Sequence, residues 1–336
     1  MEIRRIITHN DFDGVVSGAI ASKALQCEKV IFTGPNSIAR ADISIGPGDL
    51  VCDLPYPLEC GMWFDHHPGN LESLKLRGID VSRIRGRFSE EPSCARVIFG
   101  YFKELGTEFP GHFEEMVAEA DMIDSFNYTS VEEWRKETPG KLVDMSMKAA
   151  FDHPRDRTRY LGFLVDLLRE NPLEVAVGNE EVRKRIERYR REEEKMLAVI
   201  EQSVSFVDED EKEELIILDL TNFKRPPRVI KNLAYLLHPS ALGVVSINNL
   251  YSMGRKTNDM SIAISLSMNM TGREHGKDVG EILRRLNIGD GHRGAAAGLV
   301  HCSSKEEMLR RKKEVLVKIW NLWKSMPGPS EGEASC

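Results

Sequence analysis

The chain has 336 residues, of which 41% are hydrophobic and 29% charged, and its formal net charge at pH 7 is −7. These values predict a globular protein of about two domains, and the negative charge argues against a protein that binds long nucleic acids. No stretch approaches about 18 uninterrupted apolar residues, and charged residues begin at Glu2, so we expect neither a membrane span nor a signal peptide.

The first 125 residues alternate between strand-like and helix-like segments. Short apolar runs at 4–8, 29–33, 49–53 and 61–65 are typical of buried strands. Helical periodicity follows at 15–25, 93–105 and 111–124, with Ser93 as an N-cap. This alternation predicts an α/β fold whose N-terminal domain is mainly a parallel sheet flanked by helices.

The rest of the chain predicts a connector and a smaller α/β domain. Charged residues dominate 180–200, and one apolar face indicates a helix between domains. A coiled-coil partner helix is the alternative, although Glu193 interrupts its apolar seam. We therefore expect a first domain at 1–179, a helical connector at 180–203, a second domain at 204–325 and a disordered tail at 326–336.

Three of the predicted strands run into ionisable residues. His9, Asp11 and Asp13 follow the first strand, Asp53 ends the third, and the segment 65–67 (Asp-His-His) ends the fourth. Each aspartate alone is more often a turn or cap residue, and a histidine pair alone is more often an incidental feature of the surface or core. Because the carboxyl ends of parallel strands share one edge, where ligands bind, we expect these groups to converge. Asp121 and Asp124 end a later helix.

Converging carboxylates predict a cation. Two like charges 4 Å apart repel by about 4 kcal/mol at an effective dielectric constant of 20, so four carboxylates need counter-ions or must stay partly protonated. Histidine and carboxylate ligands without thiolates favour Mn²⁺, with Fe²⁺, Co²⁺ or Zn²⁺ as alternatives. The six cysteines contain no C-x-x-C pair, which indicates reduced thiols in the cytoplasm rather than a disulfide framework or a zinc knuckle.

The motifs resemble those of the DHH phosphoesterases, which are named for the triplet present here as Asp65, His66 and His67. The family also shows a histidine before Asp-x-Asp (9–13), a strand-end aspartate (Asp53), a helix-end aspartate and a glycine-rich segment, here GDGHRGAAAG at 289–298. The matching motifs follow the family's order over nearly the whole chain.

The resemblance implies two divalent metal ions, usually Mn²⁺, and hydrolysis of phosphodiester or phosphoanhydride bonds. It implies a set of metal ligands in the first domain and a phosphate-binding segment in the second domain. It also implies a catalytic pair formed by Asp65 and His67: the pair orients the metal ligands, and His67 lies near the substrate. The implied metal ligands are His9, Asp11, Asp13, Asp53, His66 and Asp124, with Asp121 as the alternative to Asp124. The implied substrate-binding residues are Gly291, His292, Arg293 and Gly298.

Two departures from the family pattern concern the substrate. Asp290 places a negative charge within the glycine-rich turn, where the family is richer in glycine. The upstream arginine of many members is missing at Ser267 and Met268. Arg255, Arg273, Arg284 and Arg285 are the candidate replacements, and the sequence does not choose among them.

The resemblance leaves several substrates open. Short oligonucleotides or small nucleotides suit a compact two-domain chain, and inorganic polyphosphate is the alternative. Cyclic dinucleotides fit less well. A non-catalytic nucleotide sensor is the competing class, but every expected ligand type is present. The resemblance also makes a homodimer an expected assembly.

Overall fold

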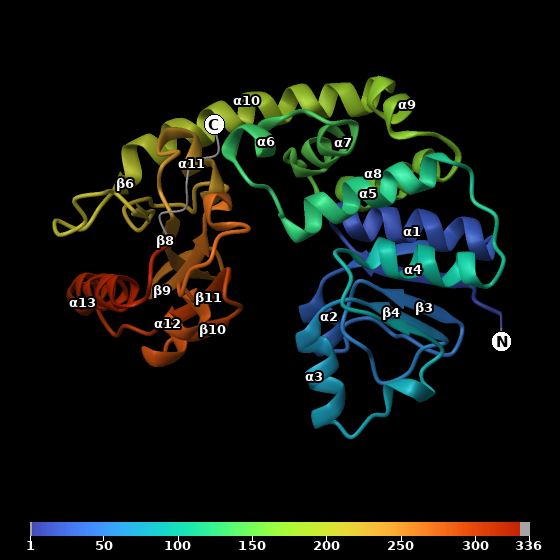
Figure 1. The fold of residues 1–336 in the computed structure, drawn as a ribbon, viewed down its shortest axis with the longest axis horizontal. Helices are drawn as coiled ribbons and strands as arrows, with labels where there is room; N and C mark the ends of the chain where they lie inside the picture. Colours follow the sequence, from blue (N-terminus) through green and yellow to red (C-terminus); the bar gives the residue numbers. More distant parts are fainter. Residues whose placement is uncertain (1, 330–336) are drawn as a thin grey trace. The chain divides into compact units, whose positions relative to one another are not determined.

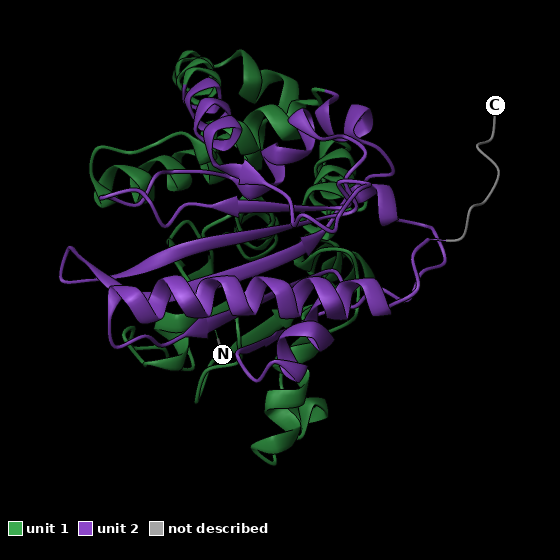
Figure 2. Ribbon diagram, turned by 90° about the vertical axis from the view of Figure 1, so that its left-hand side faces the viewer, with its two compact units in different colours: residues 1–127, 137–191 green, residues 128–136, 192–336 purple. Residues whose placement is uncertain are grey.

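The structure is a computed structural model that describes residues 2–329. Its chain contacts divide it into two compact units, which Figure 2 shows in different colours: residues 1–127 with 137–191, and residues 128–136 with 192–336. The division falls inside α10 (Glu180–Ser203), the helix that occupies the expected connector segment. Residues 330–336 of the expected disordered tail lie outside the described residues.

The first unit is built on a parallel sheet of five strands. Its spatial order is β2-β1-β3-β4-β5. The middle strands are buried on both faces, which explains their nearly continuous apolar sequences. The expected α/β fold with a parallel sheet is therefore confirmed. The strands are β1 (Arg5–His9), β2 (Val30–Thr33), β3 (Asp49–Cys52), β4 (Met62–Asp65) and β5 (Gly86–Phe88).

Helices cover both faces of this sheet (Figure 1). Ile6, Leu50 and Phe64 point into the larger core, and Ile7, Val51 and Trp63 point into the smaller one. The larger core is formed with α1 (Phe12–Leu25), α4 (Cys94–Glu104), α5 (His112–Ser125), α7 (Pro139–Lys148), α8 (Pro154–Glu170), α9 (Leu173–Gly178) and the start of α10. The smaller core is formed with α2 (Pro35–Ala39) and α3 (Pro68–Leu76).

The second unit contains a mixed sheet of six strands in the order β10-β11-β9-β8-β7-β6, in which only the β7–β8 pair is parallel. Two helices pack their apolar faces on it, through Ile282 of α12 and Trp323 of α13 among others. The elements are α6 (Val131–Arg135), β6 (Val204–Ser205), β7 (Leu215–Asp219), α11 (Ala234–Leu237), β8 (Gly243–Ser252), β9 (Arg255–Leu266), α12 (Val279–Arg285), β10 (Gly289–Gly291), β11 (Ala295–Val300) and α13 (Lys305–Ser325).

Within residues 2–329, no helix has the length and apolar character that crossing a membrane requires.

Candidate metal centre

The ionisable residues singled out in the first half of the chain gather at the carboxyl edge of the parallel sheet. His9 is the last residue of β1, Asp53 follows β3, and Asp65 ends β4. Asp11 is the N-cap of α1, where its Oδ1 accepts a hydrogen bond from the Gly14 N–H. Asp11 therefore does cap a helix, as expected for an aspartate at such a position, but the cap uses only one of its two carboxylate oxygens.

A first group consists of His9, Asp11 and Asp53, whose ligand atoms all lie within 4.8 Å of one another. His9 Nδ1 contacts Asp11 Oδ2 and lies 3.6 Å from Asp53 Oδ2. Gly14 allows this approach of β1 to α1, because a Cβ there would lie 2.2 Å from the His9 carbonyl oxygen.

A second group consists of Asp13, His66 and Asp124, again within 4.8 Å. His66 Nε2 lies 3.8 Å from Asp13 Oδ2 and 3.4 Å from Asp124 Oδ2. These distances exceed the usual length of a hydrogen bond. They are typical of ligand atoms arranged around a shared cation, because each ligand atom lies about 2.0–2.2 Å from the metal.

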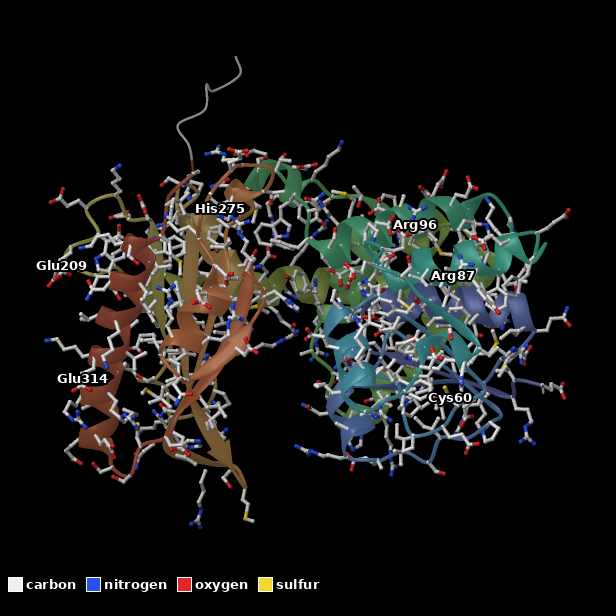
Figure 3. All side chains as sticks on the ribbon, turned by 60° about the horizontal axis from the view of Figure 1, so that its bottom comes forward. Cys60, Arg87, Arg96, Glu209, His275 and Glu314 are labelled. Carbon is white, nitrogen blue, oxygen red and sulfur yellow. The ribbon has the colours of Figure 1, made fainter. Side chains whose placement is uncertain are left out.

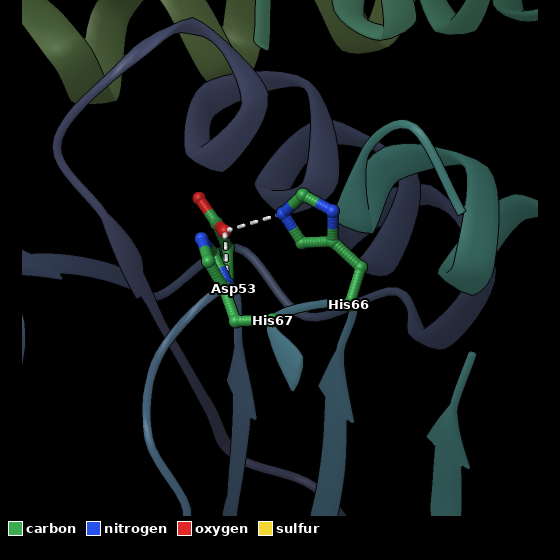
Figure 4. A group of neighbouring side chains, drawn as sticks. All are labelled: Asp53, His66 and His67. Atoms are coloured by element: carbon green, nitrogen blue, oxygen red, sulfur yellow. Dashed lines mark ion pairs between the residues drawn. The ribbon is translucent and has the colours of Figure 1, made fainter. Parts of the chain in front are cut away.

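Asp53 also belongs to a third group, with His66 and His67, whose ligand atoms again lie within 4.8 Å of one another. Its Oδ1 lies 3.7 Å from His66 Nε2 and 3.9 Å from His67 Nδ1, and these are the two dashed contacts in Figure 4. Its carboxylate therefore approaches His9 through Oδ2 and His66 through Oδ1. The backbone of Asp53 has φ = 56°, a left-handed conformation that is uncommon outside glycine and often marks functional sites.

Two buried polar atoms of the cluster have no hydrogen-bond partner among the described residues: Asp53 Oδ2 and His66 Nε2. Burying such atoms unpaired costs about 1–3 kcal/mol each. Both are standard metal-ligating atoms, and both sit among carboxylates. The donor set of imidazole nitrogens and carboxylate oxygens, without thiolates, therefore fits divalent metal ions such as Mn²⁺.

The protein groups alone leave the cluster heavily protonated. Burial disfavours the imidazolium of His9, yet Asp11 and Asp53 outweigh burial and raise its pKa to about 10. The same balance, set by Asp53, Asp13 and Asp124, raises the pKa of His66 to about 10. Burial and the Asp53 charge raise the pKa of Asp124 to about 6. The cluster thus demands positive charge, supplied either by protons or by metal ions.

Burial, together with the neighbouring carboxylates of Asp53 and Asp124, raises the pKa of Asp13 well above its ordinary value. The pKa of Asp11 moves the other way: burial would raise it, but pairing with His9 lowers it. Neighbouring carboxylates at one sheet edge therefore differ in their protonation because of their immediate partners.

Further residues orient the cluster. Buried Asp65 binds His67 Nδ1 at 2.8 Å through Oδ1 and accepts from Asn70 Nδ2 at 2.7 Å through Oδ2. Burial opposes protonation of His67, but the Asp65 carboxylate raises its pKa. The Glu91 carbonyl lies 3.0 Å from His66 Nδ1. A carbonyl can only accept, so Nδ1 carries a proton and the neutral ring offers Nε2 as its ligand atom.

The two candidate aspartates of α5 have different surroundings. Asp124 joins the second group, whereas the Asp121 carboxylate accepts from Ser93 Oγ at 2.7 Å and from Arg96 Nε at 2.9 Å. The structure thus brings Asp124, and not Asp121, to the cluster with His9, Asp11, Asp13, Asp53 and His66.

The glycine-rich segment forms the β10–β11 pair in the second unit. Gly291 and Gly298 have a packing role, because a Cβ at either would lie 2.4 Å from backbone atoms of the facing segment. Arg293 donates to the carbonyls of His275 and Lys277, while the His292 side chain is exposed. The intruding Asp290 binds Arg284 at 2.7 Å.

Among the candidate replacements for the missing arginine, Arg284 therefore lies beside the glycine-rich turn, where it also donates to the Gly291 carbonyl at 3.0 Å. Arg285 pairs with Glu281 instead. Arg255 begins β9, and Arg273 follows the turn after β9.

Sequence reasoning missed the supports of the cluster. The backbone N–H groups of Cys94 and Ala95 donate to the two oxygens of Asp13 at 2.7 and 2.8 Å. Backbone groups carry no residue signature, so no sequence pattern could have identified these partners. Asn70, three residues after the histidine pair, was also missed, and its position at the start of α3 was the available clue.

No protein-family model and no curated protein matches the sequence, but solved structures do. A pGpG-specific phosphodiesterase, PggH, of Vibrio cholerae has a TM-score of 0.72 at 20% identity, over 95% of this chain and 99% of that chain. The DHH domain of PF0399, described as a member of the s1p family of ribosomal proteins, has a TM-score of 0.57 at 13% identity, over 97% and 88%.

RecJ of Thermus thermophilus, solved in complex with Mn²⁺, has a TM-score of 0.53 at 14% identity, over 98% of this chain and 53% of that chain. At these identities the likeness concerns the fold. The resemblance to DHH phosphoesterases expected from the motifs is confirmed at that level: the chain has their two-domain fold.

Proposed function

We propose that this chain, which has the fold of the DHH phosphoesterases, is a metal-dependent phosphoesterase that hydrolyses phosphodiester bonds in short oligonucleotides or small nucleotides. One observation carries the proposal. Asp53 belongs to two groups of side chains with ligand atoms close enough to hold a metal ion, one with His9 and Asp11 and one with His66 and His67, and its buried Oδ2 has no hydrogen-bond partner within the described residues. The similarity over 99% of a pGpG-specific phosphodiesterase supports a dinucleotide-sized substrate.

In this proposal, His9 and Asp11 would hold one metal ion, Asp13, His66 and Asp124 would hold the other, and Asp53 would contribute to both. Two Mn²⁺ ions bound there would lower the pKa of a water molecule and neutralise charge on the phosphoryl oxygens. The chain's own contribution is to fix the ligand atoms. The Glu91 carbonyl sets the His66 tautomer, and the amides of α4 immobilise Asp13.

Asp65 and His67 form the proposed catalytic pair. Against the opposing effect of burial, the Asp65 carboxylate raises the pKa of the half-exposed His67 ring, which favours the protonated form of the ring. His67 can then donate a proton to the leaving oxygen of the ester, while Asp65 stabilises the imidazolium. Asn70 holds the second Asp65 oxygen and so fixes the orientation of the pair.

In the second unit, we propose that Gly291, His292, Arg293 and Gly298 contact a substrate phosphate. His292 supports this role because its side chain is exposed, and the guanidinium of Arg293 retains donors beyond those bound to the 275–277 segment. Arg284 supplies the positive charge that offsets Asp290 in the same turn.

We further propose a cytoplasmic location and a homodimer. The cysteines at 27, 52, 60, 94 and 302 are free thiols, which fits a reducing compartment. The dimer follows from the family resemblance alone, and sedimentation velocity would test it.

The test is a substrate panel with purified protein and Mn²⁺: linear pGpG, a five-residue RNA, phosphoadenosine phosphate, a cyclic dinucleotide and inorganic polyphosphate. We expect mononucleotide release from the two linear RNAs, and no release by Asp53→Ala. Hydrolysis of polyphosphate alone would replace the proposal with an exopolyphosphatase. Binding of nucleotides without turnover of any substrate would support a sensor.

A further inference from the structure

The first turn of α4 holds two of the clustered residues through its backbone. Cys94 N–H donates to Asp13 Oδ2 at 2.7 Å and Ala95 N–H to Asp13 Oδ1 at 2.8 Å. The Glu91 carbonyl, just before the helix, lies 3.0 Å from His66 Nδ1. Both Asp13 oxygens are thus anchored, so its carboxylate cannot rotate freely. The position of the 91–95 segment therefore fixes two members of the second group.

Asp121 fastens that same turn to α5. Ser93, the fully buried N-cap of α4, donates its hydroxyl to Asp121 Oδ1 at 2.7 Å and accepts from the Arg96 N–H at 3.1 Å. Arg96, labelled in Figure 3, donates its Nε–H to Asp121 Oδ2 at 2.9 Å. The Asp121 side chain is 15% exposed and the Arg96 side chain 40% exposed, so these charge-assisted hydrogen bonds lie at the edge of the buried interior.

The two aspartates of α5 thus reach the second group by different routes. Asp124 contributes its carboxylate directly, and Asp121 reaches Asp13 through Ser93 and the amides of the α4 turn. The hydrogen bonds of Asp121 run to Ser93 and Arg96 at the start of α4, whereas Asp11 is held by the Gly14 N–H at the start of α1.

We propose that Asp121 is a positioning residue for the metal ion held by Asp13, His66 and Asp124, and that it acts by holding the first turn of α4 in place. The proposal rests on the metal-dependent function proposed above. In this proposal, the contacts between α4 and α5 determine the geometry of one metal position and not of the other.

The chain offers a matched control at the opposite end of the same helix pair. Lys103 of α4 and Glu114 of α5 form an ion pair at 2.8 Å, and both side chains are at least half exposed. Glu114→Gln therefore removes a carboxylate contact between α4 and α5 without touching the turn that holds Asp13.

The experiment is a Mn²⁺ titration by isothermal calorimetry of the full chain, with the melting temperature of each metal-free protein recorded. We expect two Mn²⁺ ions in the wild type and in Glu114→Gln. In Asp121→Ala, one of the two ions should bind about tenfold more weakly, as for other groups that orient metal ligands, while the other keeps its affinity. Asp121→Asn should fall between, since its amide oxygen still accepts from Ser93 but lacks the charge that pairs with Arg96.

The outcomes separate this inference from the proposed function. A wild type that binds no Mn²⁺ would overturn both. Two wild-type sites with unchanged affinities in Asp121→Ala would overturn the positioning role alone. An equal loss at both sites in Asp121→Asn, which keeps the side-chain size, would show a general structural role and would also overturn it.

Discussion

The carboxyl edge of the first sheet and the glycine-rich turn of the second unit differ in how their polar groups are satisfied. At the sheet edge, Asp53 Oδ2 and His66 Nε2 are buried without a hydrogen-bond partner among the described residues. In the glycine-rich turn, Asp290 is paired with Arg284, and Arg293 donates to backbone carbonyls. The unpaired buried atoms at the sheet edge fit a site for a further group, such as a metal ion, whereas the paired groups of the turn contribute partly to the packing of the chain itself.

Of the tests of this contrast, metal removal should have the largest effect on the rate of hydrolysis. If the sheet edge is a metal site, exhaustive chelation should abolish hydrolysis of linear RNA dinucleotides, and added Mn²⁺ should restore it. The measurement is turnover before and after chelation, with metal content followed by elemental analysis. Full activity in protein freed of metal would refute metal catalysis.

Asp53→Ala tests the residue that belongs both to the group with His9 and Asp11 and to the group with His66 and His67. Several kcal/mol of transition-state stabilisation by metal ions corresponds to a loss of about a thousandfold or more in kcat. Initial rates with saturating Mn²⁺ would measure it. Turnover close to that of the wild type would remove Asp53 from the bridging position.

Raising the pH should strengthen metal binding. His9 and His66, each with a pKa of about 10 among the protein groups alone, are protonated at pH 7 and must lose that proton to bind a metal. Each ion should therefore bind about tenfold more tightly per pH unit between pH 7 and 9, with release of about one proton. Calorimetry in buffers of different ionisation enthalpy would count the protons, and binding without proton release would contradict the prediction.

His292→Ala and Arg293→Ala would distinguish substrate binding from packing of the chain within the glycine-rich turn. Loss of a hydrogen bond to a charged phosphate costs about 1.5–3 kcal/mol, so His292→Ala should raise KM at least about tenfold while both metal ions stay bound. Loss of metal from this variant would place His292 in the metal centre instead of the substrate site.

Arg293→Ala should show the smaller effect on KM, because its guanidinium is engaged with the His275 and Lys277 carbonyls. It should instead lower the free energy of unfolding of the second unit by about 1 kcal/mol. Chemical denaturation would measure the change. A larger rise in KM for Arg293→Ala than for His292→Ala would reverse the roles assigned to these neighbours.

Much of the fold was predictable because burial leaves a pattern in the sequence. The apolar runs that became β1, β3 and β4 are buried strands, the run that became β2 is a partly buried strand, and Ser93 caps α4 as expected. Short elements such as α2 and β5 were not predicted, since five and three residues are too few to show a periodicity.

The gathering of His9, Asp53 and His66 followed from one rule, the shared edge of parallel strands. Their role as metal ligands stays a prediction. The sequence could not separate Asp121 from Asp124, because both stand near one helix end and only the direction of each carboxylate distinguishes them. It also could not reveal that Gly291 and Gly298 pack against backbone atoms, since a glycine chosen for close packing looks like one chosen for phosphate binding.

The most direct test of the central claim is a crystal structure of the protein grown with Mn²⁺, with anomalous diffraction recorded at the manganese edge. The account predicts two anomalous peaks about 3.5–4 Å apart, with the Asp53 carboxylate between them, His9 and Asp11 beside one, and Asp13, His66 and Asp124 beside the other. A map without a peak at this sheet edge, or with a single ion that Asp53 does not touch, would contradict it.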